Sequence, residues 1–544
     1  MRLANASKFE IAATPRISVG EVLGCAWPAL ILATACLLPY LSKPFVIDDP
    51  YFLAMARQIL GHPKHPMDFT VCWNIVPNCA KAYLLTPGNT LMGYVLVPTI
   101  LTGAHEWVAH LTQLALAWTA AIAMTSLVFR FGWNPAHAIA GSLFLVAIPP
   151  FLPMASTAMP DILSTAVTLL GMERLAAWKV ERRWTQGVVA AIALGLAGLA
   201  RANLALLLPL AAFYLFNNME PKKAFEQIRQ KFWLWSPVLA GCGVLAAIIL
   251  TVREHNLALD PPPIAVGWGK IPHNVLSYMS YLSFPLPLAI CWSANRLKAG
   301  KIRSLIALFA VAASLGFSIL DLYLALFLAS FGLGALGSLL IEAWKKRDHE
   351  RLFLILWIVI PLPIAGYLHL PMKYLLPSIP AVILLCFRLM EGFAPSAKRV
   401  AAICLIVFCA GYSLLILRSD AEFAEFGRDS MYRLISPHAK AGERVWYNGQ
   451  YWSYWYAPLA GATATYQSGP QPKPGDLLVV DVLAGGSQAL APFPHRTLVD
   501  ATTHKYRFGR TMGAGAGLYS NSFGFWLWGF GTSPADRYEL WRID

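Results

Sequence analysis

The sequence predicts a polytopic α-helical membrane protein with about thirteen transmembrane helices and a small C-terminal extracytoplasmic α+β domain. Of its 544 residues, 57% are hydrophobic and 13% are charged, whereas a soluble domain carries about 25% charged residues. Runs of about twenty apolar residues, the length that crosses a bilayer, recur along most of the chain. Such a chain cannot cover itself with a hydrated surface, so we expect lipid to surround its larger part.

The first span follows a polar and basic segment. Residues 1–20 include Arg2, Lys8 and Arg16. The apolar run 22–41 that follows is long enough to cross a bilayer and has no small-residue cleavage site. We therefore expect a cytoplasmic N-terminus and a retained first helix instead of a cleaved signal peptide.

Loop charges set the topology of the later spans, which centre near residues 118, 144, 170, 193, 209, 243, 289, 310, 330, 359, 381 and 408. One further run, 84–103, contains Pro87, Gly88 and Pro98 and makes a poor continuous span. If it lies at the interface, all the basic loops fall on the N-terminal side: 130–134, 179–184, 222–231, 296–303, 345–351 and 398–399. The positive-inside rule then predicts a multi-pass inner (plasma) membrane protein, N-terminus cytoplasmic and C-terminus extracytoplasmic.

This topology divides the chain into a cytoplasmic N-terminus (1–20), a transmembrane domain (21–417) and a C-terminal extracytoplasmic domain (418–544). The first external loop, 42–107, is part of the transmembrane domain, and shorter external segments follow at 154–161, 253–280 and 369–374. Strand-like pieces occur in the tail at 444–447, 477–482 and 538–543, with Gly and Pro turns between them. The tail is therefore predicted to fold as an α+β domain.

The net charge of +14 does not indicate a nucleic-acid partner. The basic residues cluster in short loops between apolar runs, as in loops that face anionic membrane lipid.

Cys72 and Cys79 lie in the first external loop. They either form a disulfide or remain as two reduced thiols, and the sequence leaves both alternatives open. The sequence has no Walker A loop, no GxGxxG that opens a helix after a strand, no HExxH motif and no Cys-based zinc spacing, so nucleotide-driven chemistry lacks support.

An acidic pair opens the first external loop, in the segment FVIDDPYFLAMARQILG. Pro50 suits a first helical turn, with Asp49 before it as N-cap. The spacing that follows predicts a short helix lying in the interface plane. Its apolar face would carry Tyr51, Phe52, Met55 and Ile59.

Three acids are candidates for catalysis. For Asp49, a capping role and a catalytic role both stay open. Asp48 has no such structural role, and its desolvation at the bilayer edge would raise its pKa and make it a better base. Asp161 follows Pro160 at the start of a span. It either complements the helix dipole or faces the same aqueous cavity as a second carboxylate.

Basic and aromatic residues offer contacts to a substrate. Arg201 interrupts the apolar runs LGLAGLA and LALLLPLAAF, which predicts a helix break that lines a cavity. His273 precedes aromatics at the membrane edge and is either a loop residue or a ligand. Lys373 and Tyr374 either contact a lipid phosphate or anchor the chain at the interface.

In their order along the chain, these segments resemble the GT-C class of membrane glycosyltransferases. The resemblance is to the bacterial protein mannosyltransferase and aminoarabinose transferase branch, the glycosyltransferase family 39 type. It covers about residues 20 to 415 and rests on the segments DDPYFLAMARQIL, LTPGNTLMGYVL, MPDIL, GLARANLALLLP and KYLLPSIPAVILL.

The resemblance implies a GT-C fold, and it matches Asp48 to the family's catalytic acid, Asp49 to its acidic neighbour and Asp161 to the second-loop acid. Lys373 stands where the family usually has Arg and is expected at the carrier phosphate, and His273 loosely matches a metal-binding His. Related aminoarabinose transferases carry a Glu–Lys pair where this chain has LLTPG at 84–88. A divalent metal cofactor therefore stays open, as does the sugar. The expected substrate-binding residues are Tyr51, Arg201, His273, Lys373 and Tyr374.

The implied activity is that of a mannosyltransferase-like hexosyltransferase of the cell envelope, which takes a sugar from a polyprenyl-phosphate carrier. A phosphate leaving group needs little protonation, so one Asp base suffices for inverting displacement, whereas a glycosidase needs two carboxyl groups. The acceptor is a lipid, a glycan or a protein. The alternative is a multi-span transporter or flippase of a lipid or solute, which would require buried polar groups at the midplane and repeat symmetry.

Overall fold

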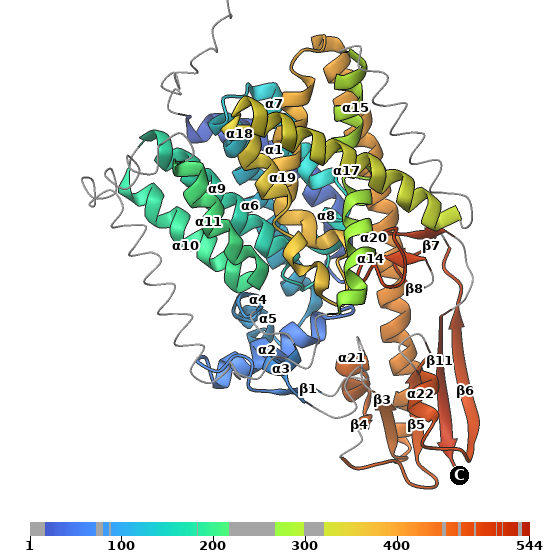
Figure 1. Cartoon of the computed structure of the whole chain (residues 1–544). Helices are drawn as coiled ribbons and strands as arrows, with labels where there is room; N and C mark the ends of the chain where they lie inside the picture. The colour runs from blue at the N-terminus through green and yellow to red at the C-terminus, as the bar shows by residue number, and fades with distance from the viewer. Residues whose placement is uncertain are drawn as a thin grey trace, which may run out of the picture.

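The computed structural model is a bundle of helices with a small β-sheet domain at one end (Figure 1). It describes residues 17–71, 80–85, 89–181, 183–216, 267–298, 320–448, 453–465, 469–482, 486–507, 509–513, 515–530 and 536–544. Six helical segments in these ranges are long and apolar enough to cross a membrane: Val19–Tyr40, Glu106–Arg130, Leu324–Lys346, His349–Gly366, Met372–Met390 and Pro395–Lys440. The chain is a helical membrane protein with a C-terminal sheet.

The bundle also contains helices that are shorter or more polar. Its members are α1 (Val19–Leu37), α6 (Glu106–Arg130), α7 (Pro135–Ala147), α9 (Asp161–Glu181), α10 (Trp184–Ala200), α11 (Leu207–Phe216), α14 (Ile271–Tyr281), α15 (Leu288–Lys298), α17 (Leu320–Lys346), α18 (His349–Ile358), α19 (Ile379–Met390) and α20 (Pro395–Lys440). The count of about thirteen spans stays a prediction, because the runs near residues 243 and 310 lie outside the described residues.

The outer surface of the bundle is apolar where lipid is expected. On α20, Val400 is 60% exposed and Val407 is 66% exposed. Large apolar side chains exposed to this extent along a helix fit a hydrocarbon solvent.

Two of the predicted basic loops lie at the same end of the bundle. Arg130, at the end of α6, pairs with Glu173 at 3.2 Å and with Glu181, at the end of α9, at 2.5 Å. Both helices therefore end together, and their starting residues Glu106 and Asp161 belong to the opposite end. The loop charges predict that 130–134 and 179–184 lie on the same side of the membrane, and the structure places both at the same end of the bundle.

The first external loop folds over the end of the bundle that carries Glu106 and Asp161. It contains α2 (Asp49–Gly61), a two-stranded ribbon of β1 (Thr70–Val71) and β2 (Ala80–Lys81), α3 (Ala82–Leu85), α4 (Leu91–Val95) and α5 (Val97–Leu101). Because α4 and α5 have five residues each, neither can cross a membrane. The ambiguous run 84–103 is thus not a continuous span in its described part.

The predicted apolar face of α2 is buried against protein. Tyr51, Phe52, Met55 and Ile59 are each at most 5% exposed, and α2 packs on α4 and α5. A Cβ on Gly93 of α4 would lie 2.6 Å from Met55 Cγ. Glycine therefore allows this close approach, and α2 lies on other parts of the loop instead of only on lipid.

Helix α20 joins the bundle to the tail. It has 46 residues and passes without a break through the predicted domain boundary between 417 and 418 (Figure 1). The tail also docks on the first loop through α21 (Ser453–Ala460). There, the hydroxyl of Tyr456 donates to Glu106 at 2.9 Å and accepts from the Phe45 amide at 2.8 Å. The tail is fixed to the bundle by a shared helix and by these contacts.

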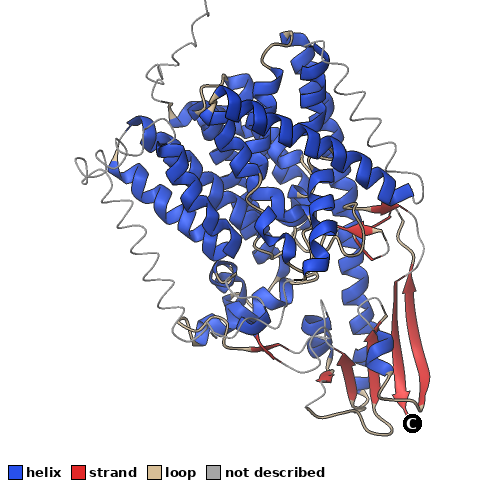
Figure 2. Cartoon of the chain, viewed as in Figure 1, coloured by secondary structure: helices blue, strands red, loops and turns tan. Residues whose placement is uncertain are grey.

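The tail sheet has the order β4-β3-β5-β11-β6, and Figure 2 shows the strands in the first loop and the tail. The strands are β3 (Val445–Asn448), β4 (Thr463–Thr465), β5 (Leu477–Asp481), β6 (Arg496–His504) and β11 (Asp536–Ile543), with α22 (Gly486–Leu490) beside β5. The three predicted strand pieces are confirmed as β3, β5 and β11. Further along the tail, β7 (Gly509–Arg510) pairs with β10 (Gly529–Phe530), and β8 (Met512–Gly513) pairs with β9 (Ala516–Gly517).

Candidate active site

The short segment 156–161, between α8 (Phe151–Ala155) and α9, is the meeting point of the charged residues near Asp48. Four charged side chains from distant parts of the chain contact it. They are Lys43 (to Ser156 O and Oγ, 3.1 Å each), Asp49 (to the Ala158 amide, 2.7 Å), Lys373 (to Met159 Sδ, 3.6 Å) and Arg201 (to Asp161 Oδ1, 2.5 Å). The second external segment predicted from the sequence is therefore the centre of the site.

Asp49 has a structural role, although not the predicted one. Helix α2 begins at Asp49 itself, and the N-cap position is Asp48, whose side chain makes no capping bond. The Asp49 carboxylate accepts from the Val46 amide at 2.9 Å and from the Ala158 amide at 2.7 Å. Burial raises the pKa of Asp49 to about 7, although Lys43 and these two amides oppose the shift. Asp49 thus ties the first loop to segment 156–161.

Asp48 has an available carboxylate. Its backbone oxygen accepts from the amides of Tyr51 and Phe52, but within the described ranges its side chain accepts no hydrogen bond and is partly exposed. Burial raises the pKa of Asp48, Asp161 raises it further, and Lys373 and Arg201 act against both. This is an environment for a general base.

The backbone before Asp48 is strained. Ile47 has a φ of 52°, a conformation that is rare for a β-branched residue. The surrounding turn is closed by the Asp49 amide, which donates to Val46 O at 3.0 Å. Such strain persists where the surroundings hold it, and it is common at functional sites.

Asp161 and Arg201 form a buried pair with unused hydrogen-bonding capacity. Arg201 ends α10 in an extended conformation before the short helix η2 (Ala202–Leu206), so the predicted break is confirmed. Its guanidinium lies 4.3 Å from the ring centre of Tyr374. Among the described atoms, Asp161 Oδ2 and Arg201 Nε are buried and have no hydrogen-bond partner. Orphaned polar atoms of this kind are expensive and point to a missing ligand.

Lys373, in the short helix η5 (Met372–Ser378), is a buried cation. It is 3% exposed, contacts Met159 Sδ, and lies 5.1 Å from the ring centre of Tyr519. Within the described ranges no carboxylate lies at salt-bridge distance from its ammonium group. The nearby His369 is kept neutral, since burial and the charges of Lys373 and Arg201 lower its pKa to about 3. The surroundings of Asp48 thus hold two cations and the second carboxylate of Asp161, which pairs with Arg201. Among the described residues Lys373 is the cation of this group that has no carboxylate partner, so it is the one best able to bind an anion. We call Asp48, Asp161, Arg201 and Lys373 the open cluster.

A second cluster, not foreseen from the sequence, lies behind Asp49. Lys43 and Asp420 form an ion pair in which both side chains are 0% exposed. Asp420 also accepts from Thr511 at 3.0 Å and from the Tyr519 hydroxyl at 2.9 and 2.8 Å. We call Lys43, Asp49, Asp420 and Tyr519 the closed cluster. Lys43 and Asp420 are 377 positions apart, so no local pattern could have indicated their contact.

Two predicted substrate contacts are engaged elsewhere in the protein. Tyr51 is 2% exposed, and its hydroxyl donates to Ala82 O at 3.3 Å. His273 lies at the start of α14, with Nε2 2.8 Å from Asn521 O and its ring 4.7 Å from that of Phe525. The described residues contain no group of three His, Cys, Asp or Glu side chains that could hold a metal. A ring nitrogen beside one backbone carbonyl and a phenyl ring, as at His273, does not fit a divalent metal.

The predicted Cys72–Cys79 pair lies outside the described residues, so its state stays a prediction.

Comparisons with known proteins give a distant structural likeness. No family model matches the chain, and no curated protein sequence matches it. The chain is similar to the crystal structure of ArnT from Cupriavidus metallidurans bound to undecaprenyl phosphate, with 14% identity, 89% of this chain and 97% of that chain covered, and a TM-score of 0.49. The apo form of the same protein gives 15% identity, 88% and 96% coverage, and a TM-score of 0.41. At these scores no residue role is transferred to this chain.

Proposed function

We propose that this chain is a glycosyltransferase that moves a sugar from a polyprenyl-phosphate carrier to an acceptor at the extracytoplasmic face of the inner membrane. The observation that carries the proposal is the open cluster. It places an unbonded carboxylate, Asp48, within the electrostatic influence of two buried cations, Lys373 and Arg201. A base beside an anion site is what displacement of a phosphate requires.

In the proposed reaction, Asp48 takes the proton of an acceptor hydroxyl. The acceptor oxygen attacks the anomeric carbon, and the bond from that carbon to the phosphate oxygen breaks. The phosphate leaves with the bonding electrons, so the product has the inverted configuration at that carbon. General-base assistance of this kind contributes about 10²–10⁴-fold to a rate.

Lys373 and Arg201 act on the leaving group. As the carbon–oxygen bond breaks, negative charge grows on the phosphate, and preorganised cations at a desolvated site stabilise that charge. Lys373 lacks a carboxylate partner in the described structure, and Arg201 Nε is unbonded. Both cations therefore have hydrogen-bonding capacity to offer a phosphate. Asp161 orients Arg201 through their contact at 2.5 Å.

The test uses purified protein in nanodiscs with radiolabelled polyprenyl-phosphate sugars and membrane extract. We expect label to move to an acceptor with the wild type, and the Asp48→Asn variant to lose this transfer. Absence of transfer from every donor, together with movement of lipid or solute in vesicles, would instead support the transporter alternative.

A further inference from the structure

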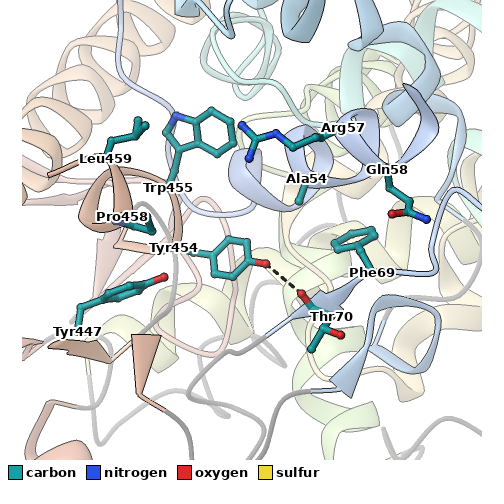
Figure 3. Close-up of a pocket in the computed structure, with 10 residues that line it drawn as sticks. All are labelled: Ala54, Arg57, Gln58, Phe69, Thr70, Tyr447, Tyr454, Trp455, Pro458 and Leu459. Atoms are coloured by element: carbon teal, nitrogen blue, oxygen red, sulfur yellow. Dashed lines mark hydrogen bonds between the residues drawn. The ribbon is translucent and has the colours of Figure 1, made fainter. Parts of the chain in front are cut away.

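A groove lies between α2 of the first loop and the tail, on the far part of the helix that begins at Asp49. It has a cavity volume of about 440 Å³, within the range of small-ligand sites. Figure 3 shows Arg57 and Gln58 reaching into it from α2, opposite Tyr447, Tyr454 and Trp455 of the tail. Two parts of the chain that are distant in sequence thus build one concave surface.

The aromatic side chains of the groove form a firm platform. The Tyr454 hydroxyl donates to Thr70 O at 3.1 Å, which holds its ring between the tail and the first loop. Phe69 lines the wall on the side of the first loop. Tyr454 and Phe69 are only partly buried, so their rings remain accessible. Rigid, accessible rings of this kind suit the apolar face of a sugar ring.

The polar side chains of the groove favour an acidic ligand. The Arg57 guanidinium lies 5.1 Å from the ring centre of Trp455, which fixes its position. Within the described ranges no carboxylate lies at salt-bridge distance from Arg57, so its donors are free to bind an anion. The Tyr447 hydroxyl lines the same groove, and no hydrogen bond to it is found among the described residues.

The position of the groove relates it to the open cluster. Arg57 follows Asp48 by nine positions along α2, which corresponds to about 13 Å at the helical rise and to about two and a half turns, so the two side chains lie on opposite sides of the helix. A ligand of a few linked sugars is long enough to span this distance. Such a ligand would have to pass around α2 to hold one unit in the groove and present a hydroxyl of another to Asp48.

We propose that this groove binds an acidic glycan portion of the acceptor, with a sugar ring on Tyr454 and Phe69 and a carboxylate or phosphate group on Arg57. The proposal rests on the transferase function and narrows its acceptor from a lipid, glycan or protein to a molecule that carries an acidic glycan.

The test measures binding without requiring transfer. The full chain in phosphatidylcholine nanodiscs is titrated with trigalacturonate and with a hyaluronan tetrasaccharide, each beside its methyl ester, and followed by saturation-transfer NMR. We expect both acids to bind more tightly than their esters. Arg57→Gln should weaken binding of the acids about tenfold to a hundredfold and make acid and ester equal. Tyr454→Ala should abolish binding of both forms, whereas Tyr454→Phe should retain it.

Matched controls separate this proposal from its rivals. Arg433→Gln removes another exposed arginine, which pairs with Asp500 at 3.6 Å and does not line the groove, and it should leave binding unchanged. Nanodiscs that contain phosphatidylglycerol test whether the anion comes from a lipid headgroup. If this lipid binds in the groove and the acidic sugars do not, the ligand is a lipid headgroup and not a glycan. No binding by the wild type, or equal binding by the wild type and Tyr454→Ala, would overturn the proposal.

The outcome is distinguishable from failure of the proposed function. Asp48→Asn should bind the acidic sugars as the wild type does. Binding by a wild type that transfers no label from any donor would remove the transferase and keep the groove. If the wild type transfers sugar and neither Tyr454→Ala nor Arg57→Gln changes the KM for the acceptor, the transferase function stands and the groove is not the acceptor site.

Discussion

The open and closed clusters both contact segment 156–161 and both contain buried charged residues, yet they differ in how many hydrogen bonds their polar atoms make. In the closed cluster Lys43 makes three hydrogen bonds and Asp49 makes two. In the open cluster, Asp48 accepts none within the described ranges, and Asp161 Oδ2 is orphaned. Burial and charge are thus common to both clusters. The open cluster has polar atoms without hydrogen-bond partners among the described residues, which suits a reactive site. The closed cluster uses its polar atoms to hold the structure together.

The largest effect on stability is expected in the closed cluster. Lys43→Met would leave Asp420 buried beside no cation, and loss of one partner of a buried pair costs about 3–5 kcal/mol. Thermal unfolding of the purified variant measures this loss. Addition of Asp420→Asn should restore part of it, because the uncompensated charge is then removed. A variant as stable as the wild type would show that the pair is not a structural tie.

The corresponding substitution in the open cluster, Lys373→Met, should lower the rate of sugar transfer. Lys373→Met removes a cation aimed at the phosphate, and loss of one such group costs about 10²–10³-fold in turnover. Because Lys373 has no carboxylate partner in the described structure, its replacement by an apolar side chain of similar length should leave the melting temperature unchanged or higher. A strong loss of stability with normal turnover would reverse the assignments of the two clusters.

The pH dependence of turnover sharpens the assignment of Asp48. Its pKa is raised by burial and lowered by Lys373, so turnover should fall as the pH falls through a value above about 3.9, the ordinary value for Asp. Lys373→Met should move this acid limb to higher pH. Asp161→Asn should move it to lower pH, since it removes a neighbouring negative charge. An acid limb that neither variant moves would mean that another group is the base.

The closed cluster should also give a slope of stability with pH, worth about 1.4 kcal/mol for each unit by which the pKa differs between the folded and unfolded states. The folded pKa of Asp49 is about 7, against about 3.9 in the unfolded chain, so the folded state binds its proton more tightly. The stability from Asp49 is therefore full below about pH 4 and is lost as the pH rises to about 7. Asp49→Asn should flatten this part of the melting-temperature profile, and an unchanged slope would contradict the buried position of Asp49.

Local sequence patterns predicted the features that depend on local physics. Apolar runs indicated helices such as α6 and α19, turn residues separated the strands of the tail, and the charge at Arg201 indicated the helix break. Asp48 was singled out because a carboxylate at the bilayer edge has no local partner. In each case the cause lies within a few residues of the effect.

Features that depend on tertiary contacts could not be predicted. Asp49 looked like an N-cap, but its carboxylate binds the Ala158 amide across 109 positions of the chain. His273 looked like a candidate ligand, but Asn521 of the tail occupies its Nε2. No local pattern singles out Tyr519, although it reaches both Asp420 and Lys373. The contacts of Asn521 and Tyr519 arise because α20 carries the tail back onto the rest of the protein.

The most direct test of the difference between the clusters compares two adjacent carboxylates. Asp48→Asn and Asp49→Asn are made in the same background, and the initial rate of sugar transfer and the melting temperature are measured for each. We expect Asp48→Asn to lose about 10²–10⁴-fold in rate while it keeps the wild-type melting temperature, and Asp49→Asn to change the melting temperature. Transfer at the wild-type rate by folded Asp48→Asn would contradict the assignment of Asp48 as the base.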